Sequence, residues 1–250
     1  MSSAIALTGV SKDYGGEHAL GDVSFGVRRG ALFGLIGADG AGKSTLMRIA
    51  VTLLDPDRGE VRVLSRDTRA QRREIRAAVG YMPQRFSLYE DLTVGENMRF
   101  FADIFGIAGS ERTERFKRLL RFSRLGPFQN RRAGNLSGGM KQKLALSCAL
   151  IHTPELVVLD EPTTGVDPLS RREFWDILRE IRSRGVTVFV STPYMEEAEY
   201  CSDLALLHGG RLLRSGTPSE MADSYPLRLY RLSAGASTLH YPQSAPRPPG

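Results

Sequence analysis

Short apolar runs separated by turn residues make up the first third of this 250-residue chain. Five such runs predict strands, at 5–10, 23–27, 31–36, 60–64 and 79–82. Glycine-containing turns at Tyr14-Gly15-Gly16 and Arg29-Gly30 separate the first three runs, and a helix is expected from about 43 to 53. The opening of the chain therefore predicts a mixture of strands and helices.

The pattern changes at about residue 92, where apolar positions begin to recur at helical spacing, and it predicts a helical insert over about 92–152. One set with this spacing is Met98, Phe101, Ala102 and Phe105. Beyond the insert, 156–159 and 186–190 are apolar without alternation, which is typical of strands buried on both faces of a parallel sheet. A helix expected at about 169–184 joins these two strands as a crossover, so the predicted fold class is α/β.

Composition predicts a domain boundary near residue 225 and argues against a chain that spans the membrane by itself. The tail covers 226–250, and it is rich in Ser and Pro and expected to be disordered from about residue 233, which leaves one domain over 1–225. The 41% hydrophobic and 25% charged contents are those of an ordinary globular protein. No apolar run approaches the roughly 20 residues that cross a bilayer, and no targeting segment is apparent. A partner is therefore expected to do any membrane spanning.

Charge and cysteine content narrow the choice of partners. The formal net charge of +6 comes with arginine pairs scattered along the chain, which favours solvated helix faces over a nucleic-acid stripe. No nucleic-acid partner is therefore expected. The two cysteines, Cys148 and Cys201, have no metal-ligand spacing and indicate a reduced cytosolic compartment.

One segment has the pattern of a phosphate-binding loop. Residues 37–44 fit G-x-x-x-x-G-K-[ST], directly after the strand expected at 31–36 and at the start of a helix. They are Gly37, Ala38, Asp39, Gly40, Ala41, Gly42, Lys43 and Ser44. The glycines let backbone amides turn inward around phosphate oxygens, and the helix N-terminus adds partial positive charge. Lys43 is expected to reach the β- and γ-phosphates of ATP, and Ser44 to bind Mg²⁺.

Two acidic residues follow the buried strand at 156–159. Asp160 and Glu161 lie at its carboxyl end, where ligands of open α/β sheets bind. Asp160 is expected to hold Mg²⁺ through water, and Glu161 to polarise the attacking water as the general base. The alternative interpretation is a solvated strand end before Pro162.

A pentapeptide, Leu136-Ser137-Gly138-Gly139-Met140, resembles the signature of ABC ATPases, and from this point the likeness covers about residues 4–225. The resemblance implies a P-loop NTPase of ABC type, with a mixed core sheet, an N-terminal antiparallel β subdomain and the helical insert. It also implies that Ser137, Gly138 and Gly139 cap the γ-phosphate of ATP held by a second subunit. Taken alone, the pentapeptide is also compatible with an N-cap serine before a helix.

Other residues fall in the order that the resemblance implies. Tyr14 matches the aromatic residue that stacks on adenine, with a packing role as the alternative. Thr45, the residue after the phosphate loop, belongs to the expected ATP site. Gln84 matches the glutamine that joins Mg²⁺ and water to the helical insert. Asp167, in Thr164-Gly165-Val166-Asp167, matches the loop that couples two active sites, the alternative being a helix N-cap.

Two positions depart from the family pattern. Pro193 stands where the family has a histidine that contacts the γ-phosphate, and proline has neither a side-chain donor nor an amide proton. Neither His152 nor His208 lies in a position to replace that histidine. Asp39 replaces the asparagine often found in the phosphate loop and adds negative charge near the phosphates. The sequence therefore supports nucleotide binding more firmly than fast turnover.

The segments 80–97 and 165–175 resemble bacterial drug- and export-type ABC ATPases that work with separately encoded permeases. The resemblance implies an ATP-binding subunit at the cytoplasmic face of the inner membrane, which hydrolyses ATP with Mg²⁺ to drive a membrane permease. A second nucleotide-binding domain, another copy or a paired domain, is the other partner. Phe86, Leu88 and Tyr89 are expected to form the permease groove or to pack in the core. The alternatives are a soluble ABC ATPase acting on ribosomes and a regulatory subunit with little turnover.

Overall fold

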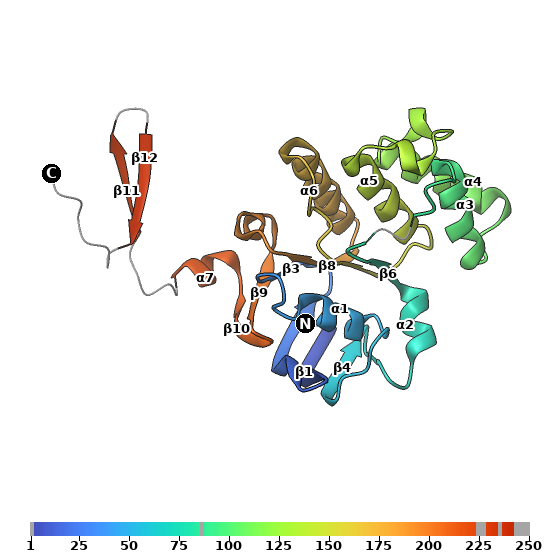
Figure 1. Ribbon diagram of the computed structural model, residues 1–250. Coiled ribbons are helices and arrows are strands. Elements are labelled where there is room, and N and C mark those ends of the chain that lie inside the picture. Colours follow the sequence, from blue (N-terminus) through green and yellow to red (C-terminus); the bar gives the residue numbers. More distant parts are fainter. Residues whose placement is uncertain (1–2, 86–87, 224–228, 235–236, 243–250) are drawn as a thin grey trace.

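The computed structural model describes residues 3–85, 88–223, 229–234 and 237–242 (Figure 1). The strands are β1 (Ser3–Tyr14), β2 (Glu17–Arg28), β3 (Leu32–Ile36), β4 (Arg58–Val63), β5 (Arg66–Asp67), β6 (Val79–Met82), β7 (Leu156–Leu159), β8 (Thr187–Thr192), β9 (Asp203–His208), β10 (Arg211–Gly216), β11 (Leu229–Ala234) and β12 (Ser237–Pro242). The α-helices are α1 (Lys43–Ala50), α2 (Arg72–Ala78), α3 (Val94–Ile104), α4 (Gly109–Phe122), α5 (Gly138–Ala149), α6 (Pro168–Ser183) and α7 (Pro218–Asp223). The short 3-10 helices are η1 (Gly126–Phe128), η2 (Ala133–Asn135) and η3 (Met195–Tyr200).

Two sheets form the body of the molecule. The first has the order β2-β1-β4-β5 and is antiparallel throughout. The second has the order β10-β9-β3-β8-β7-β6, and it is parallel except for the edge strand β10, which runs antiparallel to β9. The predicted combination of a mixed core sheet, an N-terminal antiparallel subdomain and a helical insert is confirmed.

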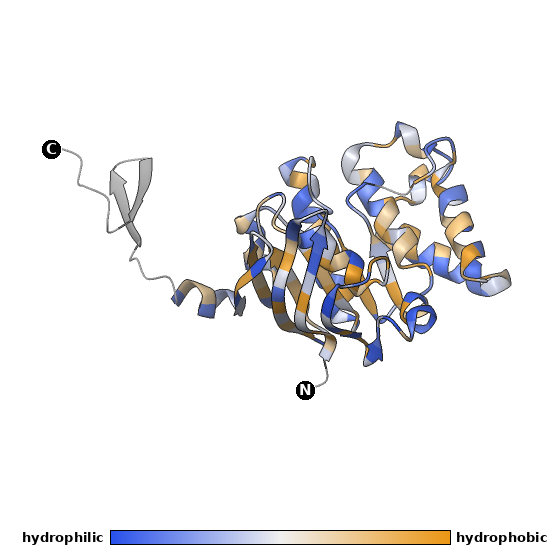
Figure 2. Cartoon of the chain, turned by 60° about the horizontal axis from the view of Figure 1, so that its bottom comes forward, coloured by the Kyte–Doolittle hydropathy of each residue, from blue (hydrophilic) through white to orange (hydrophobic). Residues whose placement is uncertain are grey.

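The six-stranded sheet divides the core into two layers, because successive side chains of a strand point to opposite faces. Phe189 of β8 packs on Phe25 and Phe33 in the layer shared with the antiparallel sheet and α1. Val188 and Val190 of the same strand face the other layer, which contains the buried sides of α5 and α6. Figure 2 shows hydrophobic residues along the strands of both sheets, as burial on both faces of the central sheet requires.

The insert between β6 and β7 is helical. Helix α3 begins with a capping box, in which Thr93 Oγ1 accepts from the Glu96 N–H (3.2 Å) and Glu96 Oε2 accepts from the Thr93 N–H (2.8 Å). Its inward residue Met98 is fully buried in the same layer as Leu144 of α5. The helices α3, α4 and α5 all lie within the range that the helical spacing predicts.

The end of the described chain differs from the expectation of disorder from about residue 233. Strands β11 and β12 pair antiparallel, from Leu229↔Pro242 to Ala234↔Ser237. Leu, Tyr and Thr in these segments favour extended backbone, whereas the expectation of disorder rested on Ser and Pro content, including the prolines that follow. Those prolines, in 243–250, lie outside the described residues.

Parallel pairing brings the segments of the site to one edge of the central sheet. Ile36, the last residue of β3, pairs with Thr192 at the end of β8. Leu159, the last residue of β7, pairs with Val190 of β8 and with Met82 of β6. The loops that leave these four strands therefore start side by side, at the carboxyl edge where open α/β sheets bind ligands.

Candidate functional site

The loop over 37–42 joins β3 to α1 and has no room for side chains at two of its glycines. A Cβ on Gly37 would lie 2.4 Å from the Leu207 carbonyl oxygen, and one on Gly42 would lie 2.5 Å from the Ala19 oxygen. Gly42 also has φ of +97° and is the N-cap of α1. The loop thus curls tightly against β9 and leads into the N-terminus of a helix, which is the geometry of an anion site.

Lys43 lies inside this loop. Its side chain is 3% exposed, and Nζ donates to the carbonyl oxygens of Gly37 (2.7 Å) and Ala38 (2.9 Å). Nζ is also 3.0 Å from Glu161 Oε1, and the Glu161 side chain is 5% exposed. Because a buried ammonium group is costly without a counter-charge, Glu161 is what compensates Lys43 here.

Asp160 joins the phosphate loop to the end of β8. Its Oδ1 accepts hydrogen bonds from Ser44 Oγ (3.0 Å) and Ser191 Oγ (2.8 Å). Its Oδ2 is buried and has no hydrogen-bond partner among the described residues. A serine hydroxyl beside a carboxylate with one oxygen to spare fits Mg²⁺, which takes one or two protein carboxylates together with substrate phosphates. No group of three or more His, Cys, Asp or Glu residues suited to a metal occurs in the part of the chain described.

Glu161 has an unusual backbone and several polar partners. Its φ of +48° lies in the left-handed region, which a non-glycine residue adopts at a cost. Its N–H donates to Ser191 Oγ (2.9 Å), which holds that conformation in place. Its Oε2 accepts from Gln84 Nε2 (2.9 Å) and Thr164 Oγ1 (3.3 Å). Strained backbone of this kind often occurs at functional sites, and the conformation is compatible with the predicted role of Glu161.

The predicted residues of the signature segment lie at the start of α5. Ser137 is its N-cap, with Oγ accepting from the Met140 N–H (3.4 Å). Ser137 and Gly138 are exposed, whereas Gly139 is buried against Ser170 of α6, where a Cβ would lie 2.7 Å from the serine Cβ. The first N–H groups of a helix have no intrahelical partner, so this exposed helix start can bind an anion.

The remaining predicted residues lie in exposed or half-buried places. Asp167 is exposed and caps α6, and the hydrogen bond from the Ser170 N–H (2.9 Å) to its Oδ1 lowers the pKa of the Asp167 carboxyl. Tyr14 is 45% exposed at the end of β1, with Lys12 Nζ 5.8 Å from its ring centroid. Asp39 is exposed in the phosphate loop, and Thr45 is half-buried in the first turn of α1.

Sequence reasoning missed Ser191 and Thr164. Ser191 is fully buried and contacts both Asp160 and the backbone of Glu161, next to the half-buried Pro193. The feature that could have identified Ser191 is its hydroxyl at the end of the apolar run 186–190, in the strand next to the one that Asp160 and Glu161 follow. This feature indicates a role in the site only when β7 and β8 are known to be neighbouring strands.

An apolar groove lies between the central sheet and the helical insert. Its volume is about 430 Å³, and Leu88, Phe101, Phe105 and His152 are among the residues that line it. The His152 ring stacks on Phe105 at a centroid distance of 3.8 Å, and burial lowers the pKa of His152 to about 4. Tyr89 is 48% exposed, and Phe86 lies outside the described residues.

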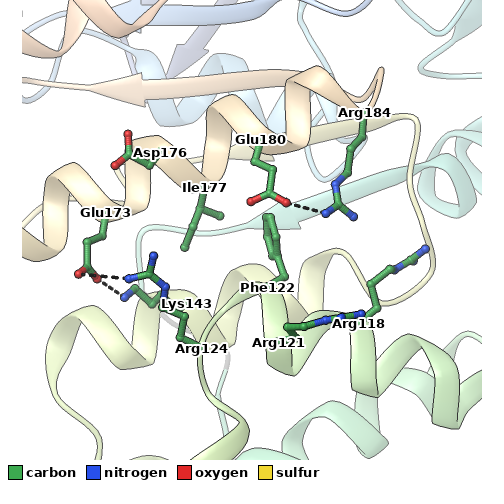
Figure 3. Close-up of a pocket in the computed structure, with 10 residues that line it drawn as sticks. All are labelled: Arg118, Arg121, Phe122, Arg124, Lys143, Glu173, Asp176, Ile177, Glu180 and Arg184. Carbon is green, nitrogen blue, oxygen red and sulfur yellow. Dashed lines mark hydrogen bonds and ion pairs between the residues drawn. The ribbon is translucent and has the colours of Figure 1, made fainter.

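A second cavity, of about 470 Å³, lies between α4, α5 and α6 (Figure 3). The acidic residues that line it are paired: Glu173 with Lys143 and Arg124, and Glu180 with Arg184. Asp176, the third, pairs with Arg179. None of the predicted site residues lines this cavity, so it is separate from the site built around the phosphate loop.

A tight glycine loop at a helix N-terminus, with a buried lysine inside it, is the arrangement that binds the phosphate groups of a nucleotide. The molecule is therefore a P-loop nucleotide-binding domain. The family model described as "ABC transporter" matches residues 20–164. The chain belongs to the ABC transporter family.

Relatives in sequence agree with this assignment. The chain is 43% identical over 234 residues to the "Probable multidrug ABC transporter ATP-binding protein YbhF" of Escherichia coli (strain K12), covering 93% of this chain and 40% of that protein. It is 41% identical over 223 residues to the "Nod factor export ATP-binding protein I" of Rhizobium sp. (strain N33), covering 89% and 73%. The chain thus spans less than half the length of the first relative and most of the second.

Solved structures agree as well. An ATP-binding subunit of an ABC transporter superposes with a TM-score of 0.79 at 32% identity, covering 88% of this chain and 92% of that one. A dimeric ATP-binding cassette in a post-hydrolysis state, bound to ADP and Pi, superposes with a TM-score of 0.78 at 27% identity, covering 85% and 98%. Within the described residues, no helix is both long enough and apolar enough to cross a membrane.

Proposed function

We propose that this chain binds and hydrolyses ATP as the nucleotide-binding subunit of a bacterial ABC exporter, with two copies closing face to face on ATP. The observation that carries the proposal is the contact between buried Lys43 and buried Glu161 at the mouth of the phosphate loop, beside Asp160. An ion pair with a purely structural role needs neither a glycine loop on one side nor a left-handed backbone on the other.

In the proposed reaction, each residue of the site has a role in binding or hydrolysing ATP. The loop amides and the start of α1 bind the triphosphate, and Lys43 exchanges the carbonyl oxygens of Gly37 and Ala38 for β- and γ-phosphate oxygens. Glu161, released from Lys43, takes a proton from the water that attacks the γ-phosphate. Gln84, which donates to Glu161 Oε2, orients that water. Mg²⁺, when bound by Ser44 and Asp160, supplies neutralisation of the phosphate charge.

The second subunit completes each site. Ser137 and Gly138 present exposed N–H groups at the start of α5, and these groups cap the γ-phosphate held by the other copy. Exposed Asp167, at the start of α6, contacts the other copy and couples the two sites. Tyr14, exposed at the end of β1, stacks on the adenine ring. The solved cassette that resembles this chain and is bound to ADP and Pi is itself a dimer.

A membrane permease is the other partner, at the cytoplasmic face of the inner membrane. The apolar groove and the exposed side of α3, with Phe100 at 37% and Ile104 at 60% exposure, offer an unpartnered surface for a helix of the permease. The proposed direction of transport is export, because the Rhizobium relative is named an export ATP-binding protein and the Escherichia coli relative is named a probable multidrug transporter protein. Pro83 lines the groove and the next residue, Gln84, donates to Glu161, so this segment connects permease contact with catalysis in the proposal.

Phosphate release by the wild type, Glu161→Gln and Pro193→His tests the proposal. We expect the wild type to hydrolyse Mg-ATP, and Glu161→Gln to lose at least about a hundredfold in rate because it lacks the general base. Glu196→Gln, at an exposed residue of η3, is the control and should behave as the wild type. An inactive wild type with an active Pro193→His would instead identify a regulatory subunit, the function that the missing histidine favours. Recovery with ribosomes and absence from permease-containing membranes would contradict the transport role.

A further inference from the structure

Glu197 is a buried carboxylate just beyond Pro193. It is 1% exposed, and its Oε2 accepts hydrogen bonds from Thr192 Oγ1 (2.5 Å) and Thr163 Oγ1 (3.1 Å). Both threonines are themselves fully buried. A buried carboxylate is retained only where its partners compensate the lost hydration, so this residue has a specific task in the fold or in the reaction.

The partners of Glu197 belong to segments that carry the proposed catalytic groups. Thr163 lies two residues after Glu161. Thr192 follows Ser191, whose hydroxyl contacts Asp160 and the Glu161 N–H. One carboxylate thus ties together the loop that leaves β7 and the end of β8, on either side of the general base.

A third partner, Arg171, lies in the first turns of α6, which Asp167 caps. Arg171 Nε is 3.7 Å from Glu197 Oε1, and both atoms are buried without a hydrogen-bond partner in the part of the chain described. The guanidinium group lies over the Tyr194 ring, 4.1 Å from its centroid. A shift of about 0.7 Å at the start of α6 would turn this ion pair into a hydrogen bond of ordinary length. A small movement of α6 would therefore be enough to form the hydrogen bond between Arg171 and Glu197.

The loop that replaces the family's histidine is held by the same carboxylate. Thr192 Oγ1 accepts from the Tyr194 N–H (3.0 Å) while donating to Glu197, so the turn around Pro193 is fixed at both ends. Pro193 itself offers no donor. The position of this turn beside Ser191 and Asp160 therefore depends on Glu197.

We infer that Glu197 is a positioning residue for ATP hydrolysis, which aligns Glu161 through Thr163 and Thr192 and links that alignment to α6 through Arg171. The inference rests on the proposed function, since it concerns the same site. When the second subunit presses on Asp167, the start of α6 moves toward η3, the bond from Arg171 to Glu197 forms, and the catalytic segments lock together.

The test compares Glu197→Gln with Glu196→Gln in the full chain. Gln keeps the size and one acceptor oxygen but removes the charge that faces Arg171, and Glu196 is an exposed carboxylate on the same short helix. We expect kcat of Glu197→Gln to fall by about ten- to a hundredfold, with KM for Mg-ATP and affinity for ADP within about twofold of the wild type. Glu196→Gln should match the wild type in all three. Equal kcat values for the wild type and a folded Glu197→Gln would overturn the inference.

Further variants separate positioning from a merely structural role. Arg171→Gln should lower kcat in the same direction, and the double variant Arg171→Gln/Glu197→Gln should be no slower than the worse single variant, because both act through one contact. If the fold-losses in kcat of the two single variants multiply in the double variant, the link from Glu197 to α6 through Arg171 is overturned. If Glu197→Gln does not fold, Thr163→Val removes a single hydroxyl at constant shape, and an unchanged kcat in that variant would refute the inference. A wild type without ATPase activity would refute the proposed function instead.

Discussion

Acidification should destabilise this protein through His152, in the groove between the central sheet and the helical insert. The ring stacks on Phe105 at 3.8 Å, and its Nε2 lies 3.2 Å from the Val79 carbonyl oxygen. Its Nδ1 is buried without a partner in the described structure. Burial makes the charged form unfavourable, and it lowers the pKa of His152 from 6.5 to about 4.

The sign and size of the effect follow from linkage. The folded-state pKa of His152 lies below the unfolded value, so the unfolded chain binds more protons between the two. The contribution to stability is therefore fully present above pH 6.5 and is lost as the pH falls from 6.5 through about 4. At pH 5 the two pKa values give a loss of about 2 kcal/mol, which solvent around this half-buried ring reduces to about 1 kcal/mol.

Urea unfolding at pH 7.5, 6 and 5 measures how much His152 contributes to the pH dependence of the free energy of unfolding. The wild type should lose about 1 kcal/mol more than His152→Gln between pH 7.5 and 5, with the difference appearing below pH 6.5. His208→Gln, at an exposed histidine that ends β9, is the matched control and should keep the full pH dependence of the wild type. If the free energy of unfolding depends on pH in the same way for the wild type and His152→Gln, the loss of stability at low pH does not come from His152.

Two substitutions test the packing of the site. Ser191→Ala should cost about 1–3 kcal/mol in stability and slow phosphate release, because the Glu161 N–H and Asp160 Oδ1 each lose a buried partner; unchanged urea unfolding would contradict this. Gly139→Ala should weaken ATPase activity, since its Cβ would lie 2.7 Å from the Ser170 Cβ, and adding Ser170→Gly should restore it. An equally impaired double variant would show that the clash is not with that side chain.

The phosphate loop and the acidic pair were predictable because their pattern is local. Residues 37–44 combine a required spacing with a strand before and a helix after, and both neighbours are read from the same short stretch. Asp160 and Glu161 follow an apolar run that is unmistakably a buried strand. In both places local chemistry and tertiary position point to the same structure.

Features that depend on distant segments were not predictable in this way. Gly37 is required because the Leu207 carbonyl approaches it, and β9, which brings that carbonyl, was not predicted. The left-handed backbone of Glu161 depends on Ser191, 30 residues further along the chain. Helix α1 ends at Ala50, before the expected end near residue 53, because Thr52 adopts φ of +64°. The first two details come from the pairing of β3 with β9 and of β7 with β8, which the residue spacing does not reveal.

The central claim, that each ATP is bound by the phosphate loop of one copy and the signature segment of another, has a direct test in mixed variants. Lys43→Ala disables the first half of a site, and Ser137→Arg blocks the exposed second half. Each variant alone should be inactive. In an equal mixture, half of the dimers contain one intact site, so ATPase activity should return to about a quarter of the wild-type value. A mixture no more active than its separate components would contradict the account.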